Sequence, residues 1–379
     1  MTLIGEQTPK LLNMNLQFFA DDPVTLSIEQ ALSGEELLVY SRNLVTPNNY
    51  LHELFFPARE ISELNVDVIR EGSRLPVMAQ IAELGTQVEY GSREGMTGQR
   101  ISIPKIQRGR AMDEKMVRTL LQSGGALRRN EFNDLRQTQL DDATYAVDAI
   151  KARKEWIAMQ AVATGKVSYL EGGVQLDVDF GYTAEQKPVL SGTDLWSDTA
   201  NSNPLEDIMS WVNTFGDKGI ALSRALASRQ VIAYLLQNKN IRIAYHGDPS
   251  GSANPPQLNQ AQLNELLVSQ GLPKIVSYDT QARVENKALS AGKLSFSNVR
   301  MAPQNRFVML PEGPLGNYLW AETTEEMLAD IQTEKTDSNG IYVFRDVSSK
   351  NPIRVETIGV NLAFPALGLN DSIVTATVL

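Results

Sequence analysis

The 379-residue chain contains no cysteine and only two histidines, His52 and His246. Without cysteine it can form no disulfide, no thiolate zinc site and no cysteine nucleophile. Two histidines cannot build a multi-histidine metal site without several carboxylates, so we expect neither a metal nor another cofactor. Each histidine is more simply interpreted as a structural or exposed residue. Stability must therefore come from packing or from association with other chains.

Membrane segments and a strong basic charge are also lacking. No apolar run approaches the ~20 residues that span a bilayer, and the first 20 residues lack the features of a secretory signal, so we expect a cytoplasmic protein without a membrane partner. The formal net charge is −10, whereas nucleic-acid-binding proteins usually carry a basic face. Short basic clusters at 105–110 and 151–154 are typical of solvated faces. With 42% hydrophobic and 21% charged residues, the chain is an ordinary globular protein with room for two or three domains.

Catalytic and nucleotide-binding motifs are missing as well: the sequence has no GxSxG, HExxH, EF-hand loop or GxGxxG. Thr164-Gly165-Lys166 resembles the end of a phosphate-binding loop. However, Gln160 stands where the first glycine belongs, and Val167 follows the lysine in place of Ser or Thr. The order helix, glycine, strand is also reversed. We interpret Gly165 as the end of a long helix, with Lys166 facing its last carbonyl groups.

Paired carboxylates leave one enzymatic alternative open. Asp177 and Asp179 are expected on one face of a strand, and Glu325 and Glu326 lie near Asp330 in the sequence. A hydrolase that uses only carboxylates needs such pairs. Spacing alone does not support that function, because scattered acids are usually solvated, and we expect no catalytic residue.

Hydrophobic periodicity predicts one long helix over residues 133–164, with Lys154 as the one basic residue on its apolar face. About 30 residues at 1.5 Å each would span about 45 Å, which is more than a small domain needs, so we expect a spine. The strict βαβα order of a doubly wound fold is absent, which favours an α+β class. Other predicted helices cover 223–237, 258–270 and one beginning at Asn203-Pro204; predicted strands cover 166–170, 174–182, 274–279, 297–302, 306–311 and three runs after residue 335.

A long hairpin is predicted over residues 81–110, with strands at 86–90 and 100–103 and a glycine-rich tip between them. A two-stranded ribbon is marginal in water by itself, so this ribbon should lie on another surface. An aromatic cluster at residues 50–57 must also be buried, either in its own core or against a neighbour. Arms and ribbons of this kind indicate an assembling subunit.

Several stretches, in their order, resemble the major capsid proteins of tailed bacteriophages, in particular the group of the lambda head protein (major capsid protein E). They are "MNLQFFA" (14–20), "NYLHELFFPARE" (49–60), "SRLPVMAQIAELGTQVEYGSREGMTGQRISIPKIQRGRAMDEK" (73–115), "EWIAMQAVATGKVSYLEGGVQLDVDFGY" (155–182), "SGTDLWSDTANSNPLEDI" (191–208) and "NRFVMLPEGPLGNYLWAETTEE" (305–326). Each stretch alone is only weakly specific for the family, but the order of the stretches along the chain is more specific.

The resemblance implies the HK97-like capsid fold, an α+β fold. It divides the chain into an N-terminal arm (1–50), a segment leading into the peripheral domain (51–79), an extended β-hairpin loop (80–112), a peripheral domain with the spine helix at about 133–164 (113–202), an axial domain (203–330) and a return to the peripheral domain (331–379).

The resemblance also implies a function: subunits form hexamers and pentamers of an icosahedral shell around double-stranded DNA, without sequence-specific DNA binding. The extended loop begins only about 80 residues in, so we expect a separate scaffolding protein, with a portal protein and, as an option, a decoration protein as further partners. The expected location is the virion capsid, assembled in the host cytoplasm. A decoration or tail subunit is the alternative within phage structural proteins. The candidate intersubunit contacts are Phe55, Phe56, Arg93, Glu94, Met96, Lys105, Arg108 and Arg110.

Overall fold

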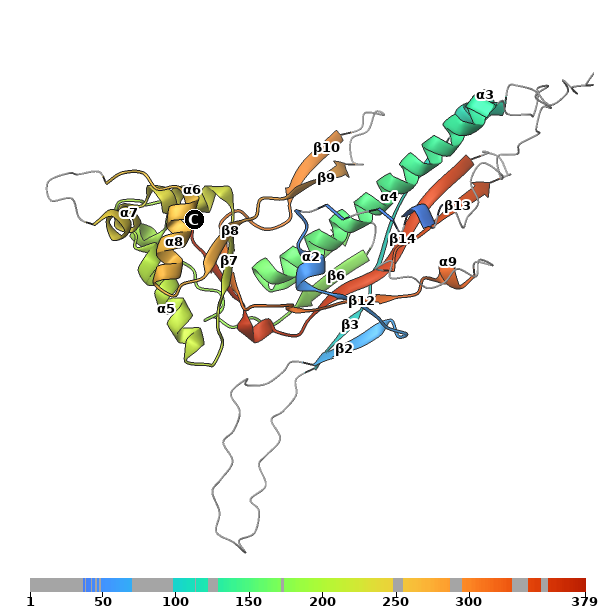
Figure 1. Ribbon diagram of the computed structural model, residues 1–379. Helices are drawn as coiled ribbons and strands as arrows, with labels where there is room; N and C mark the ends of the chain where they lie inside the picture. Colours follow the sequence, from blue (N-terminus) through green and yellow to red (C-terminus); the bar gives the residue numbers. More distant parts are fainter. Residues whose placement is uncertain are drawn as a thin grey trace, which may run out of the picture.

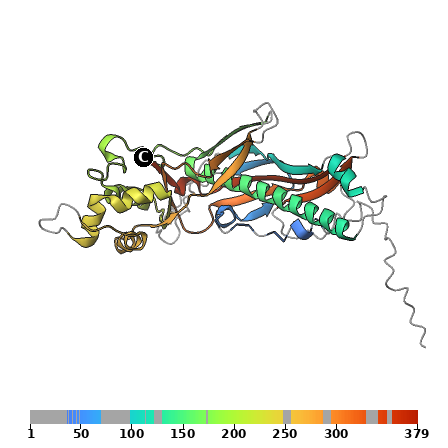
Figure 2. The same cartoon turned by 90° about the horizontal axis from the view of Figure 1, so that it is seen from above.

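The computed structural model describes residues 37–69 (except 38, 42, 45 and 48), 98–112, 114–121, 129–171, 174–247, 255–286, 295–328, 340–348 and 354–379. The described chain is elongated and flat: a long helix and a sheet form one end, and a cluster of short helices around a second sheet forms the other (Figures 1 and 2). No helix among the described residues combines the length and the apolar character needed to cross a membrane.

The predicted spine is helix α4 (Arg129–Thr164), which begins four residues before the expected start. Its apolar face is almost fully buried, with Ala143, Val147 and Ile150 at 0–1% exposure. This face packs on strand β14 (Arg354–Leu367), which lies in the predicted strand region after residue 335. Burial of side chains at three- and four-residue spacing explains why the periodicity identified this helix correctly.

Strand β14 organises a five-stranded sheet. Its first half lies between β13 (Tyr342–Ser348) and β4 (Lys105–Met112), both antiparallel to it. Its second half pairs with β12 (Gly316–Ala321), to which the short strand β1 (Ala58–Glu60) adds in parallel. The helices α2 (His52–Phe55), α3 (Glu114–Leu121) and α9 (Thr324–Met327) lie around this end of the chain.

The second sheet has the order β15 (Val374–Thr377), β11 (Arg306–Leu310), β7 (Arg224–Ala227) and β8 (Lys274–Ser277). Its core includes Trp196 and Phe307, whose ring centroids are 4.9 Å apart. The surrounding helices are α5 (Pro204–Gly216), α6 (Arg229–Gln237), α7 (Lys239–His246) and α8 (Gln260–Ser269), and the 3₁₀ turns are η3 (Gly192–Asp194) and η4 (Asn370–Ser372).

The helix predicted over 223–237 is wrong in its first part. Residues Arg224–Ala227 form β7, and the helix begins only after Ser228, whose hydroxyl accepts a hydrogen bond from the Val231 amide. Pairing of β7 with two neighbouring strands overrides the local helical pattern. The helix start at Asn203-Pro204 is confirmed, although the Asn203 side chain donates to the Glu206 carboxylate instead of capping a backbone amide.

Three two-stranded ribbons complete the described chain. Strand β2 (Asn65–Ile69) pairs with β3 (Gly98–Ser102), and β5 (Lys166–Glu171) pairs with β6 (Val174–Asp179). The third ribbon joins β9 (Gln281–Asn286) to β10 (Ser295–Arg300). The partner of β3 in the described chain is thus 65–69, not the expected strand at 86–90, which lies outside the described residues.

Two strands cross the domain boundaries that we predicted. Strand β12 lies within the segment assigned to the axial domain, yet it joins the sheet of β14. Strand β15 lies within the segment assigned to the peripheral domain, yet it pairs with β11 of the second sheet. The division into peripheral and axial domains stays a proposal. By their sheet pairing, β12 would belong to the peripheral domain and β15 to the axial domain.

Gly165 ends the spine helix, as predicted. Its φ of +69° is in the left-handed region, and its amide donates to the Ala161 carbonyl at 3.0 Å. The prediction for Lys166 is wrong, because its ammonium group pairs with Asp177 across the β5–β6 ribbon at 3.0 Å instead of facing the helix carbonyls. A side chain at residue 165 would place its Cβ 2.6 Å from the ring of Tyr182.

We therefore predict that Gly165→Ala lowers the free energy of unfolding by roughly 2–4 kcal/mol, because it combines left-handed backbone strain with overpacking. Chemical denaturation followed by circular dichroism measures this change. Gly192→Ala is the matched control: its φ is +63° and its added Cβ meets nothing within 4 Å, so it should lose only the strain, roughly 1–2 kcal/mol. Equal losses for the two variants would contradict the role of Tyr182.

Candidate assembly surfaces

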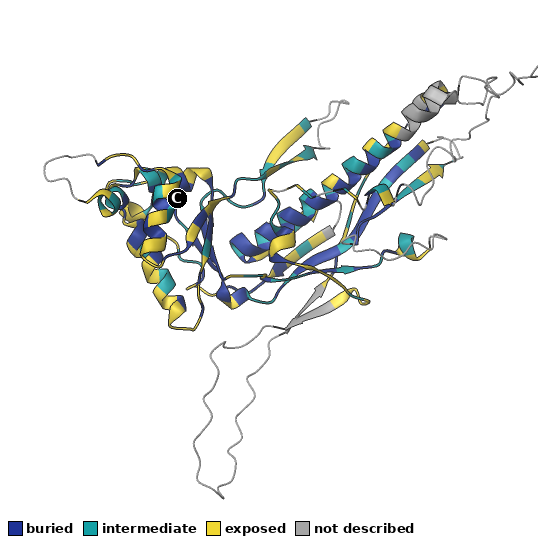
Figure 3. Ribbon diagram, viewed as in Figure 1, coloured by how far each residue is buried: buried dark blue, intermediate teal, exposed yellow. Residues whose placement is uncertain are grey.

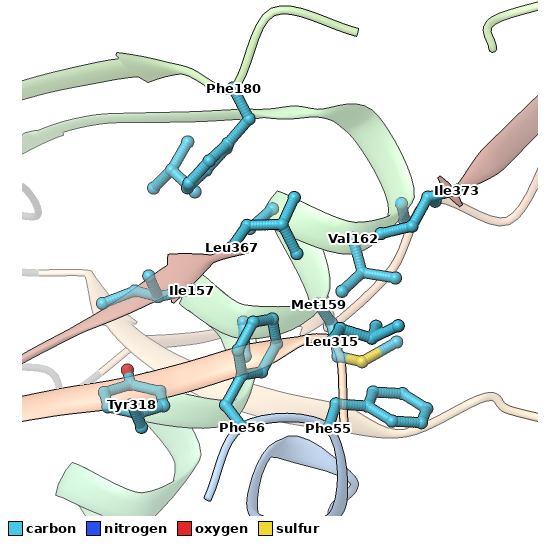
Figure 4. Packing of buried hydrophobic residues seen from close by; sticks show 14 of the residues in the cluster. Phe55, Phe56, Ile157, Met159, Val162, Phe180, Leu315, Tyr318, Leu367 and Ile373 are labelled. Atoms are coloured by element: carbon cyan, nitrogen blue, oxygen red, sulfur yellow. The ribbon is translucent and has the colours of Figure 1, made fainter. Parts of the chain in front are cut away.

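The aromatic residues Phe55 and Phe56 lie in the core of the subunit, not on a contact surface. Each is 1% exposed. Phe56 packs edge-on against Tyr318 with ring centroids 6.5 Å apart, and the Arg224 guanidinium lies 4.8 Å from the centre of the Phe55 ring. Figure 4 shows both rings pointing toward residues of α4 and β12. Their assignment as intersubunit contacts is therefore wrong, because neither ring is left for a neighbour.

Three of the predicted cations lie on β4 and have partners within their own subunit. Lys105 pairs with Glu325 of helix α9. Arg108 contacts Glu285 of β9 and donates to the Tyr145 hydroxyl at 2.7 Å. Their side chains stay 39% and 32% exposed. The ion pairs that we expected between subunits thus exist within one subunit, and contact with a neighbour stays a prediction.

Arg110 completes this row of cations. Its guanidinium lies 3.8 Å from the centre of the Tyr145 ring and 3.5 Å from the Asp142 carboxylate. Burial raises the pKa of Asp142, and the hydrogen bond from Arg110 opposes that shift. The side chain of Arg110 is 51% exposed, so it is the most accessible of the three. The other candidates, Arg93, Glu94 and Met96, lie outside the described residues.

The carboxylate pairs do not form an acid-base site in the described chain. Asp177 accepts hydrogen bonds from Ser168 and Lys166, which lower its pKa, and Lys105 likewise lowers the pKa of Glu325. A general acid needs a shift in the opposite direction. Asp179 is exposed and accepts from the Gly181 amide at 2.7 Å. Among the described residues no group of three or more acidic or histidine side chains could hold a metal ion.

A cluster of ionisable groups is buried where α2 meets the spine helix. Glu155 is 0% exposed and accepts hydrogen bonds from the amides of Leu51 and His52 at 3.0 and 2.8 Å, from His52 Nδ1 at 2.8 Å and from the Tyr278 hydroxyl. One carboxylate thus joins three segments that are far apart in the sequence. His52 is a structural histidine, as expected.

Lys154 precedes Glu155 in α4 and is 1% exposed. Its ammonium group is 4.6 Å from the centre of the Tyr318 ring. Burial lowers the pKa of Lys154 to about 8, against the opposing effect of the Glu53 carboxylate. Sequence reasoning noted Lys154 as a cation on an apolar helix face but did not predict the cluster. The signal that could have identified it was the adjacent Lys154-Glu155 pair, since a buried cation and anion next to aromatic residues must find partners.

We predict that Glu155→Gln lowers the free energy of unfolding by about 3 kcal/mol, because one amide oxygen cannot accept all the hydrogen bonds that the carboxylate accepts. Urea denaturation at pH 7 measures the change. Glu53→Gln is the control, since its side chain is 46% exposed, and it should change stability by less than about 1 kcal/mol. If Glu155→Gln leaves the free energy of unfolding unchanged, the buried carboxylate does not hold these segments together.

We also predict a pH dependence from Lys154. In the folded chain Lys154 loses its proton near pH 8, whereas the ordinary value for the unfolded chain is 10.5. Between these values the unfolded chain binds more protons, so the wild type gains stability relative to Lys154→Met as the pH rises, by about 2 kcal/mol from pH 8 to pH 10. Denaturation at several pH values checks this. Lys218→Met, at an exposed lysine, should show no such trend, and a flat difference for Lys154→Met would contradict the prediction.

Comparison with known proteins agrees with this geometry. A sequence model of the family described as phage major capsid protein E matches residues 33–358. A solved structure assigned as the capsid protein of a prophage in E. coli CFT073 is similar, with a TM-score of 0.58 and 15% identity over 92% of this chain and 99% of that chain. A phage-related protein from Bordetella bronchiseptica RB50 is also similar, with a TM-score of 0.49 and 13% identity over 90% and 95% of the two chains.

A capsid structure of the cyanophage P-SCSP1u matches more weakly, with a TM-score of 0.44 and 9% identity over 88% and 90% of the two chains. No curated protein matches the chain. The prophage capsid structure, with its TM-score of 0.58, shows the fold, which is the α+β HK97-like capsid fold. The family match covers most of the chain, so the function follows from it: the chain belongs to the phage major capsid protein E family and is a major capsid protein of a tailed bacteriophage.

Proposed function

We propose that this chain assembles into hexamers and pentamers of a closed icosahedral shell that encloses double-stranded DNA. The observation that carries the proposal is the pairing of β2 with β3, which sets Ile69 opposite Gly98 at the edge of the body (Figure 1). The 70–97 segment is joined to the body at these two paired residues, and we infer that it contacts a neighbouring copy. Each such contact can be weak, because a closed shell repeats it many times.

The net charge of −10 suits a container for DNA, since a strongly basic wall would hold the phosphate backbone tightly. The role is structural and the shell encloses DNA without reading its sequence. Virion location follows from the family; assembly in the host bacterial cytoplasm is part of the proposal. The proposal also includes a separate scaffolding protein, a portal protein at one vertex and an optional decoration protein on the outer surface.

We predict that the purified chain forms rings of five or six, sheets or shells at low salt or with a crowding agent, and uniform shells when its scaffolding protein is added. Sedimentation velocity and negative-stain microscopy detect these species. Deletion of residues 70–97 with a short glycine linker between Ile69 and Gly98 should reduce shell formation while the circular dichroism spectrum stays close to that of the wild type.

A wild-type chain that stays monomeric under all these conditions would contradict the proposal. Full-size uniform shells from this chain alone would contradict the separate scaffolding protein. Tubes or trimers would instead indicate the alternative of a tail or decoration subunit.

A further inference from the structure

The β9–β10 ribbon is a second projecting element, separate from the predicted extended loop at 80–112. Six residue pairs join its strands, from Gln281↔Arg300 to Asn286↔Ser295. It extends from the junction between the two sheets, beside the spine helix (Figure 1). Most residues of β10 are exposed or half-exposed (Figure 3). A two-stranded ribbon is marginally stable without a surface to pack on.

One face of the ribbon combines an aromatic ring with a cation. Phe296 is 50% exposed, and the Arg283 guanidinium lies 5.2 Å from its ring centre. Asn298, directly opposite Arg283 in the register, is also exposed. Aromatic residues and arginine are the types enriched in the buried centres of protein interfaces, and half of the Phe296 side chain is accessible to a partner.

The subunit fixes the position of this face. Near the far end of β9, Glu285 pairs with Arg108, which in turn donates to the Tyr145 hydroxyl of α4 at 2.7 Å. At the base, Arg300 pairs with Asp279. The Glu285 pair therefore ties β9 to the body, and the Arg300 pair joins the segments that enter and leave the ribbon, so the ribbon is held in one orientation. A surface that is ordered before it binds loses less conformational entropy on binding.

Charge indicates the kind of partner. The sequence from 281 to 300 contains four basic residues and one acidic residue, a net charge of +3, so the rest of the chain carries −10 − 3 = −13. Two long runs, 188–217 and 307–334, contain no lysine or arginine but five and six acidic residues. In the described strands Arg300 and Glu285 already have ion-pair partners, so Arg283 is the cation that complements acidic surface on another copy of the same chain.

We propose that the β9–β10 ribbon docks on an acidic surface of a neighbouring copy, with Phe296 and Arg283 as its contact residues. This inference rests on the proposed function, since it assumes that copies assemble. The contact is head-to-tail, because the ribbon meets a different surface on its neighbour, and such contacts generate closed rings when the rotation closes. Arg108 acts as a positioning residue for the ribbon through Glu285.

The absence of cysteine makes a direct test possible, because a single introduced cysteine reacts at one known position. Asn298→Cys should react with a small maleimide at least about tenfold more slowly in assembled rings or shells than in dissociated subunits, in buffer without DNA. Ala261→Cys, at an exposed position of α8 outside both acidic runs, is the control for general access. Equal rates at residue 298 in both states, or equal slowing at 298 and 261, would overturn the inference. Slowing that appears only when DNA is added would also overturn it, in favour of a nucleic-acid contact.

Substitutions test the contact energetically. Arg283→Glu and Phe296→Ser should each raise the subunit concentration needed for assembly by about tenfold or more. Lys239→Glu, with the same charge change at an exposed residue, and Val268→Ser, at a valine 60% exposed on α8, should leave it within about twofold.

Ribbon variants that match these controls would overturn only the ribbon contact, while an assembling wild type would still support the shell. A wild type that never assembles would count against the proposed function and against the inference together.

Discussion

The rest of the structure depends on the close packing of the spine helix α4 against strand β14. Gly359 makes this approach possible, because a Cβ there would lie 3.1 Å from both the Ala146 methyl group and Ile150 Cδ1. The helix can therefore lie directly on the strand, and the strand in turn holds β4, β13 and β12 in register. Elements from both halves of the sequence are fixed by this one contact. It positions the cations of β4 and, through Arg108, the β9–β10 ribbon.

Much of this fold could be predicted from the sequence, where local pattern and tertiary environment agree. Helix α4 is one example, because its buried face repeats with the helical period over several turns. Strand β7 is the opposite case: Arg224–Ala227 is short and has three apolar residues after Arg224, and helix α6 follows almost directly. Its local pattern therefore looks like an earlier start of that helix. Only its position between β11 and β8 makes it a strand. Strand β9 was missed for the same reason, since pairing with β10 defines it.

The candidate contacts show a similar limit. Sequence reasoning identified the cations of β4, but charge alone does not say whether a partner lies in the same subunit. For Phe55 and Phe56, the helical spacing of residues 52, 55 and 56 could have predicted that both rings are buried in the subunit's own core. Residues 52, 55 and 56 are buried while 53 and 54 are exposed, a helical pattern that directs both rings to one side. A short amphipathic helix places such rings in its own core, so Leu54, at 59% exposure, is the apolar residue that α2 leaves accessible.

The row of cations on β4 has a role that does not require an intersubunit ion pair. Among the described residues β4 pairs only with β14, so its other edge is open. Open edges pair readily with other strands, and charged side chains prevent this. A subunit that must stay soluble before assembly needs such protection more than most proteins do. Internal ion pairs keep Lys105 and Arg108 ordered beside that edge, and this agrees with the proposal that copies associate through projecting ribbons instead of through β4.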